Sequence, residues 1–171
     1  MNYFFTADEH YSHANVIEYC NRPFNNVAEM NETLIKNNNE IVTGEDIVLH
    51  LGDFCWDRNI SHLTNRLSGR HIFLLGSHDR WASRNLRQIW EKRFNQVYIV
   101  ACHYPLRSWA RSHYGSIHLH GHSHGRLHIN FNMLDVGVDT ANFYPLSFEE
   151  VVKRIANNNK ILNRESEEGY I

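Results

Sequence analysis

Four histidines occur at alternate positions of one short segment, namely His118, His120, His122 and His124. In an extended segment alternate side chains share one face, so this run can direct several neutral nitrogen ligands towards a metal ion. Gly121 and Gly125 allow backbone conformations that place His122 and His124 on different sides of that ion. The alternative is a solvated, histidine-rich edge strand, but further potential ligands elsewhere in the chain favour a metal site.

These further ligands follow the ends of other predicted strands. Strands are predicted at 2–7, 46–51, 71–75, 96–102 and 116–120, from runs of apolar and β-branched residues. The groups that follow them are Asp8 and His10, Asp53, Ser77 and His78, His103, and His122 and His124. Ligands collect at the carboxyl ends of strands in open α/β sheets. A mixed oxygen and nitrogen set without thiolates suits two divalent ions such as manganese, iron or zinc better than magnesium alone. The Asp8 and His10 pair by itself is weak evidence for a metal site, because both residue types also cap turns.

The elements that must position these groups alternate between strands and helices. Helices are predicted at 13–19, 26–43, 61–67 and 84–93, and at 147–155, where Ser147 and Glu150 form a capping box. Asn15 is expected to cap the first helix. A last strand at 133–138 is expected to pair antiparallel with a neighbour, and the polar tail 158–171 is expected to be peripheral. We therefore predict an α/β fold with a single domain over 1–171.

Composition narrows the class of protein. The chain has 171 residues, a formal net charge of −2 and a sequence pI near 6.7, which argues against sequence-independent binding of duplex nucleic acid as the main task. The stretch 58–126 nevertheless holds 11 Lys and Arg against 2 Asp and Glu. This positive middle suits an anionic substrate, and ordinary surface arginines explain it equally well.

Cysteine usage and hydropathy indicate the compartment. Cys20, Cys55 and Cys102 are odd in number and widely spaced, so neither a disulfide framework nor a thiolate zinc site is indicated. No stretch approaches the roughly 20 apolar residues that a membrane span requires, and the first residues do not look like a secretion signal. We expect a cytoplasmic protein without a membrane partner.

The order and spacing of the motifs resemble the calcineurin-like metallophosphoesterase family, in particular its small single-domain bacterial and phage members. That family's signature runs Asp-x-His, Gly-Asp, Gly-Asn-His-Asp/Glu, a lone His, and Gly-His-x-His. The corresponding segments span about residues 1 to 140 and are Asp8-Glu9-His10, Gly52-Asp53, Gly76-Ser77-His78-Asp79, His103 and Gly121-His122-Ser123-His124. The resemblance implies a four-layer sandwich, with two mixed β-sheets packed face to face and helices outside.

The resemblance also implies a role for each matching residue. One metal ion would be held by Asp8, His10, Asp53 and His124, and the second by Asp53, Ser77, His103 and His122. Manganese is the first expectation for both ions, with iron, zinc, nickel or cobalt as alternatives. A hydroxide shared by the two ions would attack the phosphoryl group, and His78 would protonate the leaving oxygen. Asp79 would orient the ring of His78, and turn formation is the alternative for Asp79.

One position departs from the family signature, since Ser77 stands where the family has Asn. A serine hydroxyl is a poor neutral ligand, so the second ion is expected to bind weakly or through water and the activity to be reduced. The implied substrate is a small phosphorylated or cyclic-phosphate molecule, a nucleotide being favoured, with His13, Arg107 and Trp109 as candidate substrate contacts. A nuclease of the same family and a catalytically impaired scaffold are the alternative functions.

Overall fold

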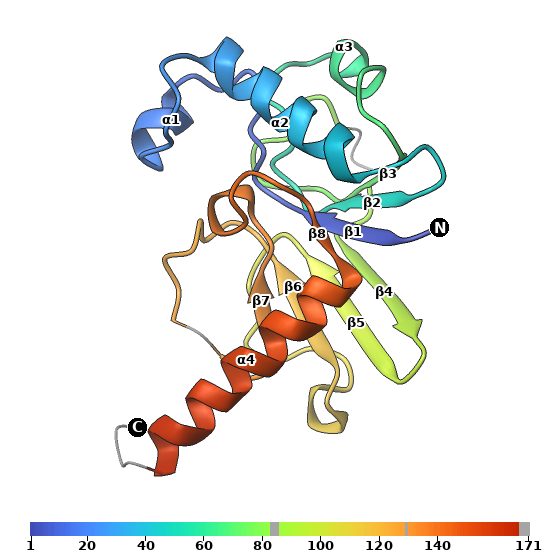
Figure 1. Cartoon of the computed structure of the whole chain (residues 1–171), viewed down its shortest axis with the longest axis vertical. Coiled ribbons are helices and arrows are strands. Elements are labelled where there is room, and N and C mark those ends of the chain that lie inside the picture. The colour runs from blue at the N-terminus through green and yellow to red at the C-terminus, as the bar shows by residue number, and fades with distance from the viewer. Residues whose placement is uncertain (83–85, 129, 168–171) are drawn as a thin grey trace.

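Two four-stranded mixed β-sheets pack face to face in the computed structural model, which describes residues 1–82, 86–128 and 130–167 and side chains as far as residue 164 (Figure 1). The first sheet has the strand order β3-β2-β1-β8, and the second has the order β4-β5-β6-β7. The bounds in the first sheet are Tyr3–Thr6 for β1, Ile47–His50 for β2, Arg70–Phe73 for β3 and Leu146–Ser147 for β8. Those in the second are Ile89–Phe94 for β4, Val97–Cys102 for β5, Ile117–His120 for β6 and Met133–Asp135 for β7. The predicted fold class is confirmed.

Strands β1, β2 and β3 run parallel, and β8 pairs antiparallel with β1. The apolar runs in β1 and β2 follow from this arrangement, because a strand covered on both faces needs apolar side chains at every position. Phe5 and Leu49 are fully buried between the sheets, in one cluster with Ile99 and Leu119 of the second sheet. This shared core holds the carboxyl ends of β1, β2, β5 and β6 close together.

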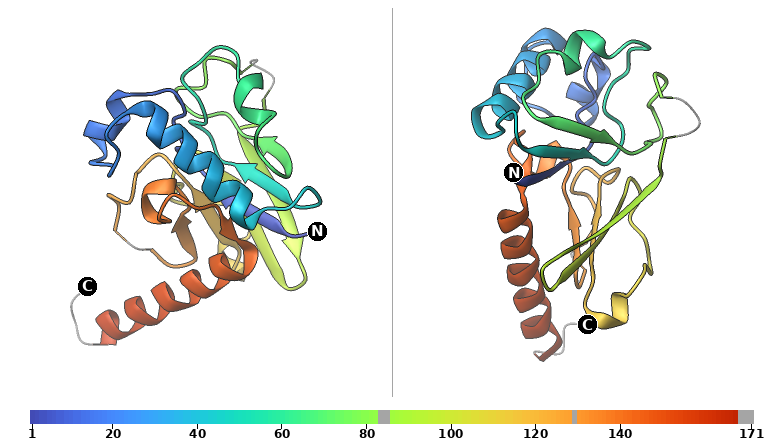
Figure 2. Two further views of the ribbon diagram at one scale, coloured as in Figure 1. Left: turned by 45° about the horizontal axis from the view of Figure 1, so that its top comes forward. Right: turned by 90° about the vertical axis from the view of Figure 1, so that its right-hand side faces the viewer.

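Three helices cover the outer face of the first sheet (Figure 2), namely α1 (Asn15–Tyr19), α2 (Val27–Ile41) and α3 (Ser61–Thr64). Met30 and Leu34 of α2 pack on Phe54 in a second core cluster. Helix α2 begins at Asn26, whose side chain accepts a hydrogen bond from the Glu29 amide at 2.9 Å. The remaining helix, α4 (Phe148–Glu167), contacts β1, β7 and β8. None of the helices within the described residues is long and apolar enough to cross a membrane.

The helix predicted at 84–93 is wrong in its described part, because residues 89–94 form β4, antiparallel to β5. Residues 84 and 85 lie outside the described residues. In β4 the side chains of Trp90, Lys92 and Phe94 lie on the more buried face, which is the two-residue period of a strand. The ammonium group of Lys92 lies 4.1 Å from the centre of the Tyr3 ring. The charged Lys92 on the inward face interrupts the alternation of apolar and polar residues that indicates a strand in the sequence. The aromatic ring that makes this position favourable belongs to the other sheet, so the sequence around Lys92 does not reveal it.

Three smaller predictions are also corrected. Strand β7 pairs parallel, not antiparallel, with β6, since it returns through a long loop rather than a tight hairpin. Ala14 rather than Asn15 precedes the first turn of α1, without a capping side chain. Helix α4 continues past the predicted end at 155, because Leu162 is buried and Asn159 exchanges hydrogen bonds with Asn132.

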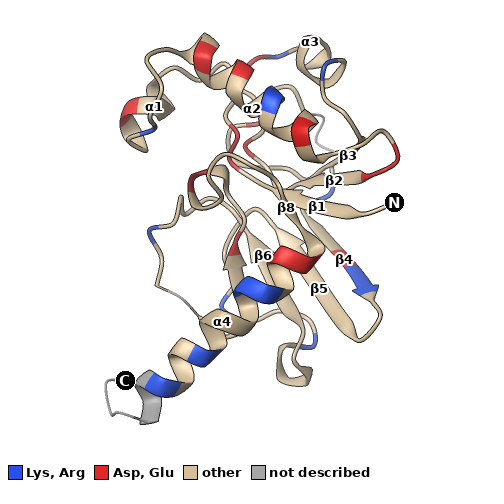
Figure 3. Cartoon of the chain, in the orientation of Figure 1, with Lys and Arg blue, Asp and Glu red and all other residues tan. Residues whose placement is uncertain are grey.

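Charged residues are spread over the surface elements. In Figure 3 Lys and Arg are scattered over α2, β4, α4 and several loops rather than gathered on one element. Of these helices and strands only β4 belongs to the stretch 58–126, whose other described Lys and Arg lie at the start of β3 and in loops.

Candidate metal centre

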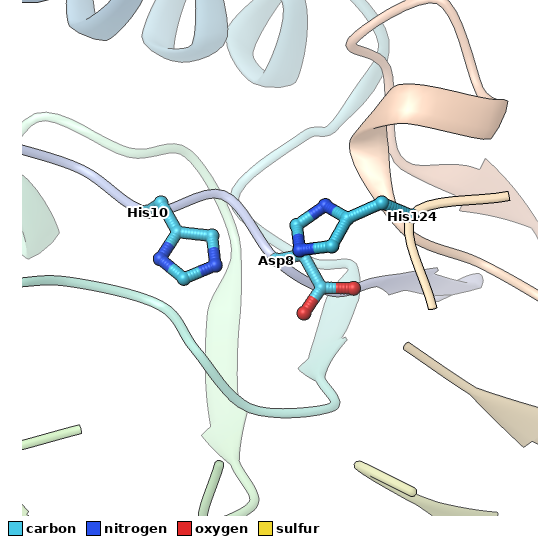
Figure 4. Close-up of side chains that lie close together, drawn as sticks. All are labelled: Asp8, His10 and His124. Carbon is cyan, nitrogen blue, oxygen red and sulfur yellow. The ribbon is translucent and has the colours of Figure 1, made fainter. Parts of the chain in front are cut away.

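Two clusters of potential ligands lie where strands of both sheets end. Asp8, His10 and His124 form the first cluster, and Asp53, His103 and His122 form the second. Within each cluster the potential ligand atoms all lie within 4.8 Å of one another. Figure 4 shows the first cluster, with two side chains from the segment after β1 and one from the loop after β6. The structure therefore brings together, from both sheets, six of the seven residues predicted as ligands.

The backbone at these positions is unusual. Five of the six residues have left-handed conformations, with φ values of 57° at Asp8, 52° at His10, 56° at Asp53, 66° at His122 and 48° at His124. Such values are uncommon for residues with a Cβ and cost of order 1–3 kcal/mol each. They end each strand abruptly and turn the side chains towards the centre. Backbone strain concentrated at one place favours a functional role for that place.

Asp53 belongs to the second cluster and also approaches His10 of the first. Its Oδ2 atom is 3.3 Å from His103 Nε2 and 3.7 Å from His10 Nε2, and its Oδ1 atom accepts a hydrogen bond from the His78 amide at 2.7 Å. Burial opposes ionisation of this carboxyl, but the His103 ring and the His78 amide outweigh burial and hold the pKa of Asp53 well below its usual range. Asp53 is therefore an ionised carboxylate within reach of both clusters.

Ser77, the seventh predicted ligand, also lies at this carboxylate. Its hydroxyl group donates a hydrogen bond to Asp53 Oδ2 at 3.0 Å, and its side chain is exposed. The residue that departs from the family signature is therefore next to the carboxylate that both clusters approach.

Two buried ligand atoms have no hydrogen-bond partner within the described part of the chain, namely Asp8 Oδ1 and His103 Nε2. The other polar atom of each side chain is occupied. Asp8 Oδ2 accepts a hydrogen bond from the His122 amide at 2.8 Å, and His103 Nδ1 lies 3.1 Å from the Leu51 carbonyl oxygen, to which it can donate. Burial raises the pKa of Asp8 to about 7. A divalent cation at each cluster would satisfy the free atom there and neutralise the carboxylates, so these residues fit such ions.

The histidine His10 is also prepared for ligation. Burial lowers the pKa of its ring to about 3, so the imidazole is neutral near pH 7 and has a lone pair for a metal ion. Its Nδ1 atom lies 3.3 Å from His13 Nδ1. The Nε2 atom is the one that faces Asp53.

Asp139 and Arg22 form a buried ion pair that supports the first cluster and that no sequence motif indicated. Asp139 Oδ2 lies 2.7 Å from His124 Nδ1, and Arg22 donates two hydrogen bonds of 2.8 Å to the same carboxylate. Burial opposes the ionisation of both Asp139 and His124, yet their contact holds the pKa of Asp139 at about 2 and that of His124 at about 10. With Nδ1 held by Asp139, the Nε2 atom of His124 is left for a metal ion once its proton is displaced.

Arg22 also stabilises the strained segment after β1. Its guanidinium donates to the carbonyl oxygens of Asp8 at 2.7 Å and Glu9 at 2.9 Å. One fully buried side chain therefore connects Asp139 with the backbone of the first cluster. No spacing rule connects positions 22 and 139, so the sequence offers no signal for this contact.

Asp79 makes contacts that its motif does not predict. Its carboxylate accepts hydrogen bonds of 2.8 Å from the amides of Asp53, Phe54 and Gly76, and one of 3.0 Å from the Trp81 indole. It therefore joins the loops after β2 and β3, and among the described residues no hydrogen bond links it to the ring of His78. The alternative of turn formation is closer to what the structure shows.

An aromatic wall stands beside His78, whose side chain is exposed. The rings of His13 and Trp56 stack at 4.2 Å with an interplanar angle of 9°, and the His78 ring centre lies 5.5 Å from that of Trp56. The guanidinium carbon of Arg80 lies 4.5 Å from the Trp56 ring centre. His13 is thus placed next to the clusters as expected, whereas Trp56 and Arg80 were missed because they belong to no ligand motif.

The other two predicted substrate contacts are not brought to the clusters. Trp109 donates from its indole to Ser116 Oγ at 3.0 Å, and its ring lies 5.2 Å from that of His118. It anchors the loop 103–116, since its partners belong to that loop and to β6. Arg107 is exposed and makes no ion pair or hydrogen bond with either cluster in the part of the chain that is described.

Scanned against models of known protein families, the chain matches none of them. It is 36% identical over 160 residues to the uncharacterized protein MJ1445 of Methanocaldococcus jannaschii, a match that covers 87% of this chain and 88% of that protein. The chain belongs to the MJ1445 family. Because the match covers 87% of this chain, it extends across both sheets.

Two solved structures are similar to this member of the MJ1445 family. A protein of unknown function from Aquifex aeolicus, AQ665, shares the fold, with a TM-score of 0.71, 20% identity and coverage of 90% of this chain and 99% of that one. An uncharacterized protein of Streptococcus pneumoniae TIGR4, described as a predicted phosphoesterase, has a TM-score of 0.47 and 16% identity. That likeness covers 80% of this chain and 70% of that one, and it carries no argument about activity.

Proposed function

We propose that this protein is a phosphoester hydrolase that uses two divalent metal ions. The observation that carries the proposal is the position of Asp53 between two clusters of oxygen and nitrogen ligands. The motif order that resembles the calcineurin-like metallophosphoesterases supports it. The substrate is a small phosphorylated or cyclic-phosphate molecule, with nucleotides favoured.

The residues of the chain have separate tasks in this proposal. Two divalent ions bound at the clusters would supply positive charge for phosphoryl oxygens and lower the pKa of a water molecule. Asp53 would serve both ions, while Asp8, His10 and His124 would hold one ion and His103, His122 and Ser77 would hold the other. His78 is exposed beside the clusters and delivers a proton from its ring to the leaving oxygen. Asp139 keeps the ring of His124 in one orientation.

Metal-dependent turnover tests the proposal directly. Protein stripped with a chelator is expected to hydrolyse neither p-nitrophenyl phosphate nor bis-p-nitrophenyl phosphate. Addition of manganese is expected to restore turnover best, among manganese, iron, zinc, nickel and cobalt, with up to two ions bound per chain. The preference between monoester and diester then separates a phosphatase from a diesterase or nuclease. Absence of both bound metal and metal-dependent turnover across the pH range would contradict the proposal and favour a scaffold.

Replacement of His78 by alanine tests the source of the proton. We expect turnover of alkyl phosphates to fall about a hundredfold and that of p-nitrophenyl phosphate to fall much less, since a good leaving group needs little protonation. The measurement is kcat/KM for both substrates at equal metal occupancy. An equal loss on both substrates would instead indicate that His78 binds the phosphoryl group.

The Ser77→Asn variant tests the one departure from the signature of the calcineurin-like metallophosphoesterases. The exposed hydroxyl at Asp53 Oδ2 leaves room for an amide oxygen that can serve as a ligand. A charge-assisted contact contributes about 1.5–3 kcal/mol, so kcat/KM is expected to rise ten- to a hundredfold, with an unchanged shape of the pH profile. Ser77→Ala, which offers no oxygen, is the matched control. If Ser77→Asn leaves activity and metal stoichiometry unchanged, Ser77 is not a defect in the site.

A further inference from the structure

A cavity of about 220 Å³ opens beside the second ligand cluster. Gly76 and His103 form the side of the cavity nearest that cluster. The other side chains around it are Leu75, Gln88, Ile89, Cys102, Tyr104 and Leu106. Because His103 is shared, any group in this cavity lies next to the second cluster.

The described residues that line this cavity are mostly apolar. Apart from His103 its side chains are apolar or uncharged, and Gln88 supplies the one side-chain amide among them. No Lys, Arg, Asp or Glu lines it within the described residues. Among the described residues an anionic group therefore finds no Lys or Arg partner in the cavity, whereas an uncharged apolar group gains by leaving water there. Ile89 is 51% exposed at the cavity although it is large and apolar.

Tyr104 lines the cavity and also contacts the second cluster. Its ring is 48% exposed, and its centre lies 4.9 Å from that of His103 and 4.8 Å from that of His122, both in edge-to-face contact. A planar group in the cavity would therefore lie beside an aromatic ring that itself touches two side chains of the second cluster.

The segment that carries Tyr104 is held in place by a buried histidine. His118 Nδ1 lies 3.0 Å from the Val100 carbonyl oxygen, to which it can donate, and His118 Nε2 accepts from the Leu106 amide at 3.1 Å. Burial lowers the pKa of His118 to about 4, so the ring is neutral and can accept that hydrogen bond. The ring of Trp109 covers His118. The wall of the cavity is therefore preformed rather than dependent on a ligand.

We propose that this cavity binds the organic group of the substrate, and that this group is a single uncharged ring or a comparably small apolar group. The inference rests on the proposed function, because the phosphoryl group must sit at the clusters. The volume is below the roughly 300–1,000 Å³ of pockets for drug-sized ligands, which limits the occupant to about one ring. No Lys or Arg among the described residues lines the cavity to pair with a second phosphate, and the Gln88 amide offers N–H donors and an acceptor oxygen to a polar edge of the ring.

The test compares two phosphonates that cannot be hydrolysed. Manganese-loaded protein is titrated calorimetrically with phenylphosphonate and with methylphosphonate, and phenylphosphonate is expected to bind about tenfold more tightly. Ile89→Ala is expected to weaken phenylphosphonate three- to tenfold and to leave methylphosphonate unchanged. Leu127→Ala is the matched control, since Leu127 is 53% exposed and lines a different cavity. A circular dichroism spectrum and the metal content establish that each variant is folded and loaded.

Equal affinities for the two phosphonates would overturn the assignment of the cavity, as would an equal effect of Ile89→Ala on both or no binding of either one. These outcomes are separate from the test of the proposed function. Metal-dependent hydrolysis can persist when the phosphonates bind equally, and a preference for phenylphosphonate is measurable even in a protein that turns nothing over.

Discussion

The Asp53→Asn protein is expected to lose both metal ions together and to show a kcat/KM lowered by about a thousandfold or more. The reason is that Asp53 Oδ2 approaches ligands of both clusters, at 3.3 Å from His103 Nε2 and 3.7 Å from His10 Nε2. An amide has one oxygen and no charge, so one ion would lose the only carboxylate of its cluster and the other would keep that of Asp8 alone. A thousandfold loss corresponds to about 4 kcal/mol of transition-state stabilisation, which is within what metal ions supply in such sites.

Metal content by mass spectrometry and calorimetric metal affinity, measured beside kcat/KM, check this result. Asp57→Asn is the matched control. Asp57 lies in the same loop, but its carboxylate is paired with His62 at 3.5 Å on the surface, so metal content and activity are expected to stay unchanged. If Asp53→Asn keeps one ion at its normal affinity, Asp53 does not serve both ions.

Gly76→Ala is expected to damage the site through space alone. A Cβ atom at Gly76 would lie 2.2 Å from the Asp53 amide nitrogen and 2.3 Å from Asp53 Oδ1. Neither atom is free to move, because Asp79 holds that amide and the His78 amide holds that oxygen. Overpacking typically costs 1–3 kcal/mol, and contact with backbone places this variant near about 3 kcal/mol. The Tm is then expected to fall by about 6–12 °C, with loss of tight metal binding.

Thermal unfolding of metal-free protein and calorimetric metal titration measure the two parts of this effect. Gly44→Ala is the control, since a Cβ there meets nothing within 4 Å, and its Tm is expected to change little. A Gly76→Ala protein with normal Tm and normal metal affinity would show that the loops after β2 and β3 can move apart without cost.

Several parts of the fold and the site could be predicted from the sequence because each depends on local patterns. The apolar run at 46–51 predicts a strand buried on both faces, and β2 is one. Strand ends followed by Asp53 or by the pair His122 and His124 predict a common site, because carboxyl ends of parallel strands meet at one edge. Asn26 begins a helix as its residue type indicates.

Other features depend on contacts that arise only in the folded chain. The pairing of Asp139 with Arg22 joins residues 117 positions apart, and neither belongs to a motif. Asp79 accepts hydrogen bonds from three backbone amides, which its motif does not predict. The helix predicted over residues 89–93 is wrong, because the inward Lys92 of β4 lies over Tyr3 of the other sheet, a contact that the local sequence does not indicate. In each case the deciding partner is distant in sequence.

The strand order β3-β2-β1-β8 has a consequence for how the chain is made. A ribosome releases β1, β2 and β3 early, and these three can pair as soon as Phe73 has emerged, yet β1 keeps one edge unpaired until Leu146–Ser147 arrive as β8. Neither ligand cluster is complete before His122 and His124 have been synthesised. A nascent chain therefore exposes an open strand edge until residue 147 has emerged. On the proposed function, neither ion can be captured before residues 122 and 124 have been made.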